Sequence, residues 1–211
     1  MKTLVIDCAT EACSVALFDG DALIAGDFRV LGRGHAEQLV PMIAALPDKG
    51  KADLIAVALG PGSFTGVRVG LAAARALAFA WGAELVGYPT LALVAAIARA
   101  QHPGQATTVA MTGGHGEWFV QPFDGSGEAQ APLTSLPPEQ AAVQCQTALV
   151  AGSQAEALVT LRGTGTAILA ATATTVMGFA AFMVADNGGL RGIGELAVIG
   201  ISIAAITAIL V

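Results

Sequence analysis

The stretch from Leu59 to Gly70 constrains the fold most, and it runs Leu-Gly-Pro-Gly-Ser-Phe-Thr-Gly-Val-Arg-Val-Gly. A buried-looking strand from Asp53 to Leu59 leads into it, and a helical pattern follows at once. Its glycines permit backbone angles that residues with a Cβ resist, while Pro61 holds one φ angle. Ser63 or Thr65 is placed to cap the helix, whose free N–H groups suit an anion. The sequence therefore predicts a strand, a tight loop and a helix here.

Three strand-like segments open the chain. They are Lys2 to Cys8, Cys13 to Phe18, and Ala22 to Val30, with Asp19-Gly20-Asp21 as a hairpin turn between the last two. Asp7 and Thr10 form an Asp-x-x-Thr turn after the first strand, and Ser14 follows it. Two interpretations of this turn stay open: contact with a phosphate, or side chains that hold turn amides.

A helix is predicted from Gly34 to Leu46, because Leu39 and Met42 belong to an apolar face at helical spacing. Pro41 lies inside this pattern, and an interior proline costs about 3 kcal/mol. We expect that cost to be offset either by packing of a kinked helix on the sheet or by packing against a partner helix. His35 is either an interface residue or an exposed residue of the first turn.

The helix after the glycine loop is predicted from about Val67 to Trp81 and is rich in alanine. Arg68 and Arg75 are seven residues apart and so lie on roughly the same face. Small side chains allow close approach, so we expect the sheet on one side of this helix and a partner on the other. Arg68 either contacts that partner or an anion, or it pairs locally.

The remaining order predicts a mixed sheet with helices on both faces. A fifth strand is expected from Gly82 to Tyr88, a helix from Thr90 to Ala100, and two further strands from Thr107 to Met111 and from Glu117 to Phe123. His102-Pro103-Gly104 marks a boundary between two lobes.

Composition limits the function classes. Net charge is −6 and charged residues make up 12% of the chain, so no basic surface for RNA is evident. Three scattered cysteines, Cys8, Cys13 and Cys145, favour reduced thiols and a cytoplasmic location. No secretory signal is recognised at the N-terminus.

Residues beyond about Leu158 change character. Ala167 to Ala185 carries no charge, and neither does Leu196 to Val211. Since about 17–25 apolar residues suffice to span a bilayer, these two runs are a candidate membrane hairpin. They resemble a transmembrane helix pair of the resistance–nodulation–division exporters. A fusion of two reading frames, a designed sequence, and soluble helices that cover the second lobe are the alternatives.

Motifs for catalysis are missing from the pattern. The three histidines form no zinc-protease motif, Ser63 is not in a nucleophile elbow, and no Walker-type phosphate loop exists. We therefore predict no catalytic residue, no metal site and no cofactor.

The glycine loop, the Asp7 turn and the His-Ala-Glu-Gln-Leu-Val-Pro-Met-Ile run together resemble the TsaB family. The resemblance covers residues 1 to about 158. It implies an α/β chain of the actin-like ATPase or ribonuclease H-like fold, with a complete N-terminal lobe (1–102), an incomplete second lobe (103–160) and an apolar helical tail (161–211).

The resemblance also implies a role. TsaB-like chains are non-catalytic scaffold subunits that pair with a TsaD-like catalytic paralogue, joined by a TsaE-like ATPase, to make N6-threonylcarbamoyladenosine in tRNA. Contact with tRNA would come through the complex, and a homodimer is an alternative assembly. The interface residues that this implies are His35, Glu37, Leu39, Met42, Gly62, Ser63, Phe64, Thr65, Gly66, Arg68 and Arg75, and the vestigial nucleotide turn is Asp7, Thr10 and Ser14.

Two other functions stay open. In the first of these functions, the actin-like lobe retains nucleotide binding or peptidase activity. In the second, the tail would anchor the chain to a membrane or derive from a transporter.

Overall fold

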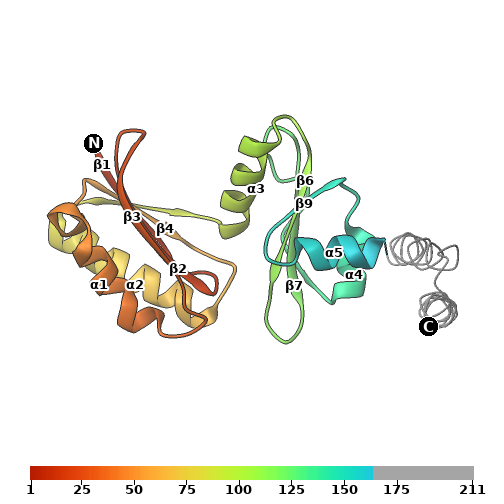
Figure 1. The fold of residues 1–211 in the computed structure, drawn as a ribbon, viewed down its shortest axis with the longest axis horizontal. Coiled ribbons are helices and arrows are strands. Elements are labelled where there is room, and N and C mark those ends of the chain that lie inside the picture. Colours follow the sequence, from red (N-terminus) through yellow and green to blue (C-terminus); the bar gives the residue numbers. More distant parts are fainter. Residues whose placement is uncertain (164–211) are drawn as a thin grey trace, which may run out of the picture. The chain divides into compact units, whose positions relative to one another are not determined.

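The computed structural model describes residues 1–163 (Figure 1). The chain divides into two compact units, Met1–Ala155 and Glu156–Val211. The described end of the second unit contributes helix α5 (Ala155–Arg162). The predicted tail (161–211), including its exporter-like and membrane interpretations, lies almost wholly outside the described residues. Within residues 1–163, no helix is long and apolar enough to cross a membrane.

The first sheet has five strands in the order β3-β2-β1-β4-β5. Their bounds are β1 Lys2–Asp7, β2 Ala12–Asp19, β3 Ala22–Val30, β4 Leu54–Ala58 and β5 Glu84–Tyr88. The first three strands are antiparallel, while β4 and β5 run parallel to β1. The sheet is mixed, as the order of the segments predicted, and it agrees with the actin-like fold that the family resemblance implies.

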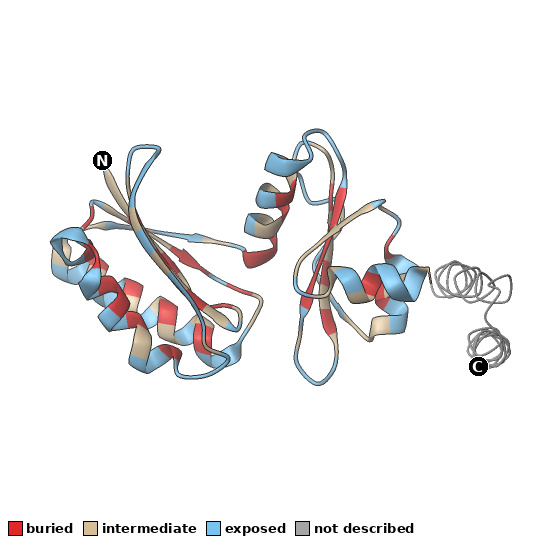
Figure 2. Ribbon diagram, in the orientation of Figure 1, coloured by how far each residue is buried: buried red, intermediate tan, exposed pale blue. Residues whose placement is uncertain are grey.

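Two helices cover one face of this sheet (Figure 1). They are α1 (His35–Ala45) and α2 (Phe64–Trp81), and a short 3-10 turn, η1 (Pro47–Gly50), joins α1 to β4. Alternate residues of β1 and β2, such as Leu4, Ile6 and Val15, point into the core beneath them. Buried positions recur along both helices at the turns that meet the sheet (Figure 2).

The third helix does not cover the other face of the first sheet, so the prediction of helices on both faces was wrong for the described residues. Helix α3 (Thr90–Gln101) packs instead against β6 (Thr107–Thr112) of a second sheet. Leu91 and Ala95 from α3 meet Val109, Met111 and Phe123 in a separate core. Apolar spacing predicts that a helix buries a face but does not say against which sheet.

The second sheet has the order β8-β7-β6-β9. Its other strands are β7 (Trp118–Phe123), β8 (Thr134–Leu136) and β9 (Leu149–Ala151), and α4 (Pro138–Gln144) packs on β7. β6 and β7 are the two strands predicted here, and they pair antiparallel, while β9 joins β6 in parallel.

Candidate functional site: the glycine loop and the α1–α2 layer

The glycine loop lies directly against the turn that follows β1. The Ser63 amide donates to the Ala9 carbonyl at 2.7 Å. A Cβ added at Gly62 would overlap the carbonyl oxygen of Ala9, and one at Gly66 would overlap that of Cys8. Glycine is therefore required at both positions by close backbone contact. Gly60 needs its glycine for another reason, because its φ is +87°.

Ser63 is the N-cap of α2. Its hydroxyl oxygen accepts from the Gly66 amide at 3.1 Å, so the helix begins at Phe64, three residues earlier than predicted. Since this oxygen satisfies a backbone N–H, Ser63 acts in the structure as a cap. Of the two caps that the sequence offered, the structure uses Ser63.

A row of small residues lets α2 approach the sheet. Gly66, Gly70, Ala74 and Ala78 are the buried residues of α2, and each lies one helical turn from the next. A Cβ at Gly70 would lie 3.6 Å from the Cys8 Cβ and 3.7 Å from Ile6. The larger apolar residues Val67 and Leu71 are only half-buried, at the margin of this row.

The opposite side of α1 and α2 is exposed and partly apolar. Phe64 is 74% exposed, Phe79 93% and Val40 61%. The Arg68 guanidinium lies 3.4 Å from the centre of the Phe64 ring and donates to the Phe64 carbonyl at 3.0 Å. We call this surface the α1–α2 layer. Its exposed residues are Glu37, Val40, Pro41, Ala44, Phe64, Arg68, Ala72, Arg75, Ala76 and Phe79.

Predicted interface residues divide between this layer and the core. Glu37, Phe64, Arg68 and Arg75 are exposed on it, and Ser63 and Thr65 lie at the exposed start of α2. Leu39 and Met42, in contrast, are at most 1% exposed, so they support α1 from below. Gly66 is buried and Gly62 half-buried, so their contribution is to the loop's shape.

His35 is neither exposed in the first turn nor part of the surface. Its side chain is 6% exposed, and Nε2 lies 3.0 Å from the Thr10 carbonyl and 3.3 Å from the Ala12 carbonyl. The imidazole thus ties the start of α1 to the turn between β1 and β2. The expectation of an exposed His35 was wrong, because helical spacing alone does not show which neighbouring loop folds over a residue.

In the turn after β1, two side chains hold backbone amides. An Asp7 carboxylate oxygen accepts from the Ala9 amide at 2.8 Å, and the Thr10 hydroxyl accepts from the Ala12 amide at 3.1 Å. This arrangement matches the second interpretation of the turn, in which the side chains hold turn amides. Ser14 lies beside Asp7 in the sheet register. A vestigial nucleotide role for these three residues stays a prediction.

Tyr88 completes this turn, and the sequence interpretation missed it. Its hydroxyl lies 3.3 Å from an Asp7 carboxylate oxygen and 3.4 Å from the Ile6 carbonyl. Burial raises the pKa of Asp7, while the bonds from the Ala9 amide and from Tyr88 oppose that rise. Burial also raises the pKa of Tyr88. A signal was available, because Tyr88 is the chain's one tyrosine and ends a strand parallel to β1.

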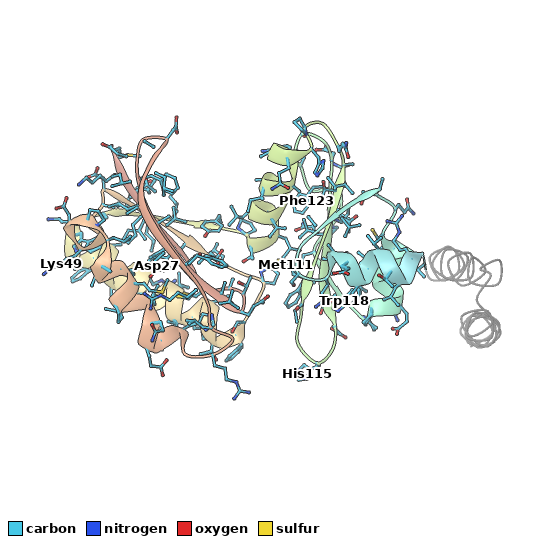
Figure 3. All side chains as sticks on the ribbon, in the orientation of Figure 1. Asp27, Lys49, Met111, His115, Trp118 and Phe123 are labelled. Carbon is cyan, nitrogen blue, oxygen red and sulfur yellow. The ribbon has the colours of Figure 1, made fainter. Side chains whose placement is uncertain are left out.

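A cavity of about 500 Å³ adjoins the glycine loop. Thr10, Glu11 and Ser63 are among the residues that line it, as are Met111 and His115, which Figure 3 labels. Cys8 and Cys13 are buried behind the turn with their sulfurs 3.5 Å apart, and burial raises the pKa of both thiols. Within residues 1–163, no three His, Cys, Asp or Glu side chains are grouped to hold a metal ion.

Comparison with known proteins decides the family. The model of the family described as "TsaD: tRNA N6-adenosine threonylcarbamoyltransferase" matches residues 29–180, well over half of the chain. The chain belongs to this TsaD family.

Curated proteins that are similar in sequence to this TsaD-family chain carry two different names. The tRNA threonylcarbamoyladenosine biosynthesis protein TsaB of Escherichia coli is 38% identical over 100 residues, which are 45% of this chain and 43% of that protein. The tRNA N6-adenosine threonylcarbamoyltransferase of Erythrobacter litoralis is 32% identical over 115 residues, 51% of this chain and 33% of that protein. The chain thus spans less than half the length of these curated relatives.

Among solved structures, YeaZ from Pseudomonas aeruginosa resembles this TsaD-family chain with a TM-score of 0.62 and 27% sequence identity. The match covers 79% of this chain and 92% of that one. The similarity to TsaB and YeaZ agrees with the family resemblance that the glycine loop indicated.

Proposed function

We propose that this chain is a non-catalytic scaffold subunit in the synthesis of N6-threonylcarbamoyladenosine in tRNA, and that it pairs with a TsaD-like transferase through the α1–α2 layer. The observation that carries the proposal is the 93% exposure of Phe79 near the end of α2, on a layer that also exposes Phe64 at the start of that helix and Val40 on α1. Large apolar side chains grouped on one helix surface are typical of a protein-binding site. Arg68, Arg75 and Glu37 supply charges on the same layer.

The loop supports the same proposal. Ser63, Asp7 and Thr10 each hold a backbone amide, so these polar groups shape the loop and the start of α2. Gly62 and Gly66 allow the loop to lie against β1, and this places Phe64 and Arg68 at the edge of the layer. The loop is therefore a support for a docking surface.

The proposal includes further partners. A TsaE-like ATPase joins the complex, tRNA contacts this chain only through the complex, and the complex works in the cytoplasm. The name of the Escherichia coli relative, a tRNA threonylcarbamoyladenosine biosynthesis protein, supports this pathway. When the transferase is absent, a homodimer through the same layer is the alternative assembly.

Co-purification with the TsaD-like transferase of the same genome tests the proposal. Phe79→Ser removes an exposed aromatic anchor from the layer, and we expect binding to weaken by roughly 30-fold or more, as at interface hot spots. Phe28→Ser is the matched control, because Phe28 is 67% exposed on β3 and points to the face opposite its neighbour Arg29, which bonds to Gln38 of α1. Equal binding by both variants would exclude the layer as the interface, and turnover by this chain alone would exclude a non-catalytic role.

One observation favours a second function. The cavity beside the glycine loop has about 500 Å³, and Thr10, Gly62 and Ser63 are among the residues that line it. A nucleotide-binding enzyme of the actin-like fold would use this place. Calorimetric titration with ATP and Mg²⁺ separates the two functions, since saturable binding by the isolated chain would favour the enzyme.

A further inference from the structure

The three lysines of the chain, Lys2, Lys49 and Lys51, line one pocket. The pocket has a volume of about 580 Å³ and lies where β1 and β4 begin, at the opposite end of these central strands from the glycine loop. Lys2 opens β1 and Lys51 follows the η1 turn. Lys49 lies within that turn (Figure 3). In a chain with a net charge of −6, this grouping of ammonium groups is unusual.

The charges at this pocket do not cancel. Lys2 Nζ lies 2.7 Å from an Asp48 carboxylate oxygen, and the Lys2 backbone amide donates to Asp53 at 2.9 Å. Both carboxylates that line the pocket are thus engaged by Lys2. Three lysines against two aspartates leave one net positive charge. Within residues 1–163, neither Lys49 nor Lys51 forms an ion pair.

The backbone of the η1 turn has an unusual conformation at Asp48 and Lys49. Asp48 and Lys49 have φ angles of 53° and 55°, and Gly50 continues with 71°. Left-handed backbone is uncommon for residues with a Cβ. The Lys49 amide donates to the Leu46 carbonyl at 2.9 Å, and buried Gly50 packs against Ile43. The turn therefore has a defined shape anchored to the core.

Trp81 forms an apolar wall of the same pocket. It is half-buried against the first core at the end of α2, so part of its surface faces the pocket. A flat aromatic surface beside free ammonium groups matches a ligand with a base and a phosphate, because bases stack on aromatic rings and lysine binds phosphate.

We propose that this pocket binds a nucleotide unit, with its base on Trp81 and its phosphate at Lys49 and Lys51. The unit comes either as a free mononucleotide or as part of a single-stranded RNA. The pocket shares no residue with the α1–α2 layer, so the site does not depend on how this chain pairs with the transferase. Direct binding of RNA here would replace the expectation that tRNA reaches this chain only through the complex.

Two probes distinguish the sources: AMP, and a short fluorescein-labelled single-stranded RNA. Binding of AMP is followed by Trp81 fluorescence in a Trp118→Phe background, which leaves one tryptophan. Binding of the RNA is followed by anisotropy with the unaltered full chain, so the test does not depend on the folding of that variant. For the RNA, we expect affinity to fall with salt, with a slope of about −0.7 per phosphate contact.

Lys49→Ala and Lys51→Ala are each expected to weaken binding by roughly three- to fivefold, the range of an exposed ion pair. Arg33→Ala is the matched control, because it removes one exposed positive charge from the loop before α1. Saturable binding of either probe that weakens in the two lysine variants supports the site and identifies the source. The proposal is overturned if neither probe binds, or if Arg33→Ala weakens binding as much as the lysine variants do. Co-purification of the lysine variants with the transferase shows separately whether the α1–α2 layer still binds that partner.

Discussion

The Tyr88 hydroxyl lies 3.3 Å from the Asp7 carboxylate, although the two residues are 81 positions apart in the chain. Each residue ends a strand, and the two strands run parallel in one sheet. The contact joins β5 to the turn on which the glycine loop rests. It explains how a half-buried carboxylate is tolerated there, because a buried charge needs hydrogen-bond donors.

Tyr88→Phe should lower the free energy of unfolding by about 1 kcal/mol, since it removes one hydrogen bond and keeps the ring. It should also raise the pKa of Asp7 further, because the Tyr88 bond is one of the two that lower it. Urea unfolding measures the first effect, and carbon NMR of the Asp7 carboxyl measures the second. An unchanged Asp7 pKa in the variant would show that the bond is not made in solution.

Asp7 should also make stability depend on pH. Its pKa is raised in the folded protein above the ordinary value of 3.8, so the folded state holds its proton more tightly than the unfolded chain. The stability that this contributes is fully present below pH 3.8 and is lost as the pH rises through the folded pKa. The free energy of unfolding of the wild type, relative to that of Asp7→Asn, should therefore be highest at acidic pH. A difference that is the same at pH 4 and pH 7 would contradict the raised pKa.

Gly66→Ala should destabilise the fold by about 1–3 kcal/mol or more, because its Cβ would overlap the Cys8 carbonyl and the backbone must shift. Gly114→Ala is the matched control: nothing lies within 4 Å of the added Cβ. We expect the control to stay within about 0.5 kcal/mol of the wild type in thermal or urea unfolding. Equal stability of the two variants would refute close contact between the loop and β1.

Ser63→Ala should cost about 1 kcal/mol, the usual value of a helix N-cap. Thr65→Ala should cost less, because in the structure it is the Ser63 hydroxyl that accepts from the Gly66 amide. Chemical unfolding compares the two, and amide exchange at Gly66 reports the bond directly. Faster exchange in Thr65→Ala than in Ser63→Ala would reassign the cap.

His35→Asn should lower stability by about 1–3 kcal/mol, since it withdraws a buried ring that bonds to carbonyls of the β1–β2 turn. His115→Asn is a matched change at an exposed residue with a φ of 56°, which asparagine tolerates. The control should stay within about 0.5 kcal/mol of the wild type. If the two variants unfold alike, His35 does not tie α1 to the turn.

Local patterns were sufficient for much of the fold. β-branched and apolar runs located β1, β3 and β4, and the hairpin turn at Asp19-Gly20-Asp21 fitted the register of the first strands. The glycine spacing indicated the loop before α2, because a loop that tight accepts few other residues. Helix bounds were less accurate, since the cap that starts α2 depends on the conformation of one side chain.

What the sequence determined by itself was the local chemistry: which segments form strands and helices, where glycine is needed, and which residues have helical spacing. Only the tertiary structure decided that α3 packs on the second sheet, that His35 is buried, that Tyr88 meets Asp7, and that the three lysines share a pocket. The reason is physical. Backbone propensity acts over a few residues, whereas these contacts join segments whose distance in the chain carries no local signal.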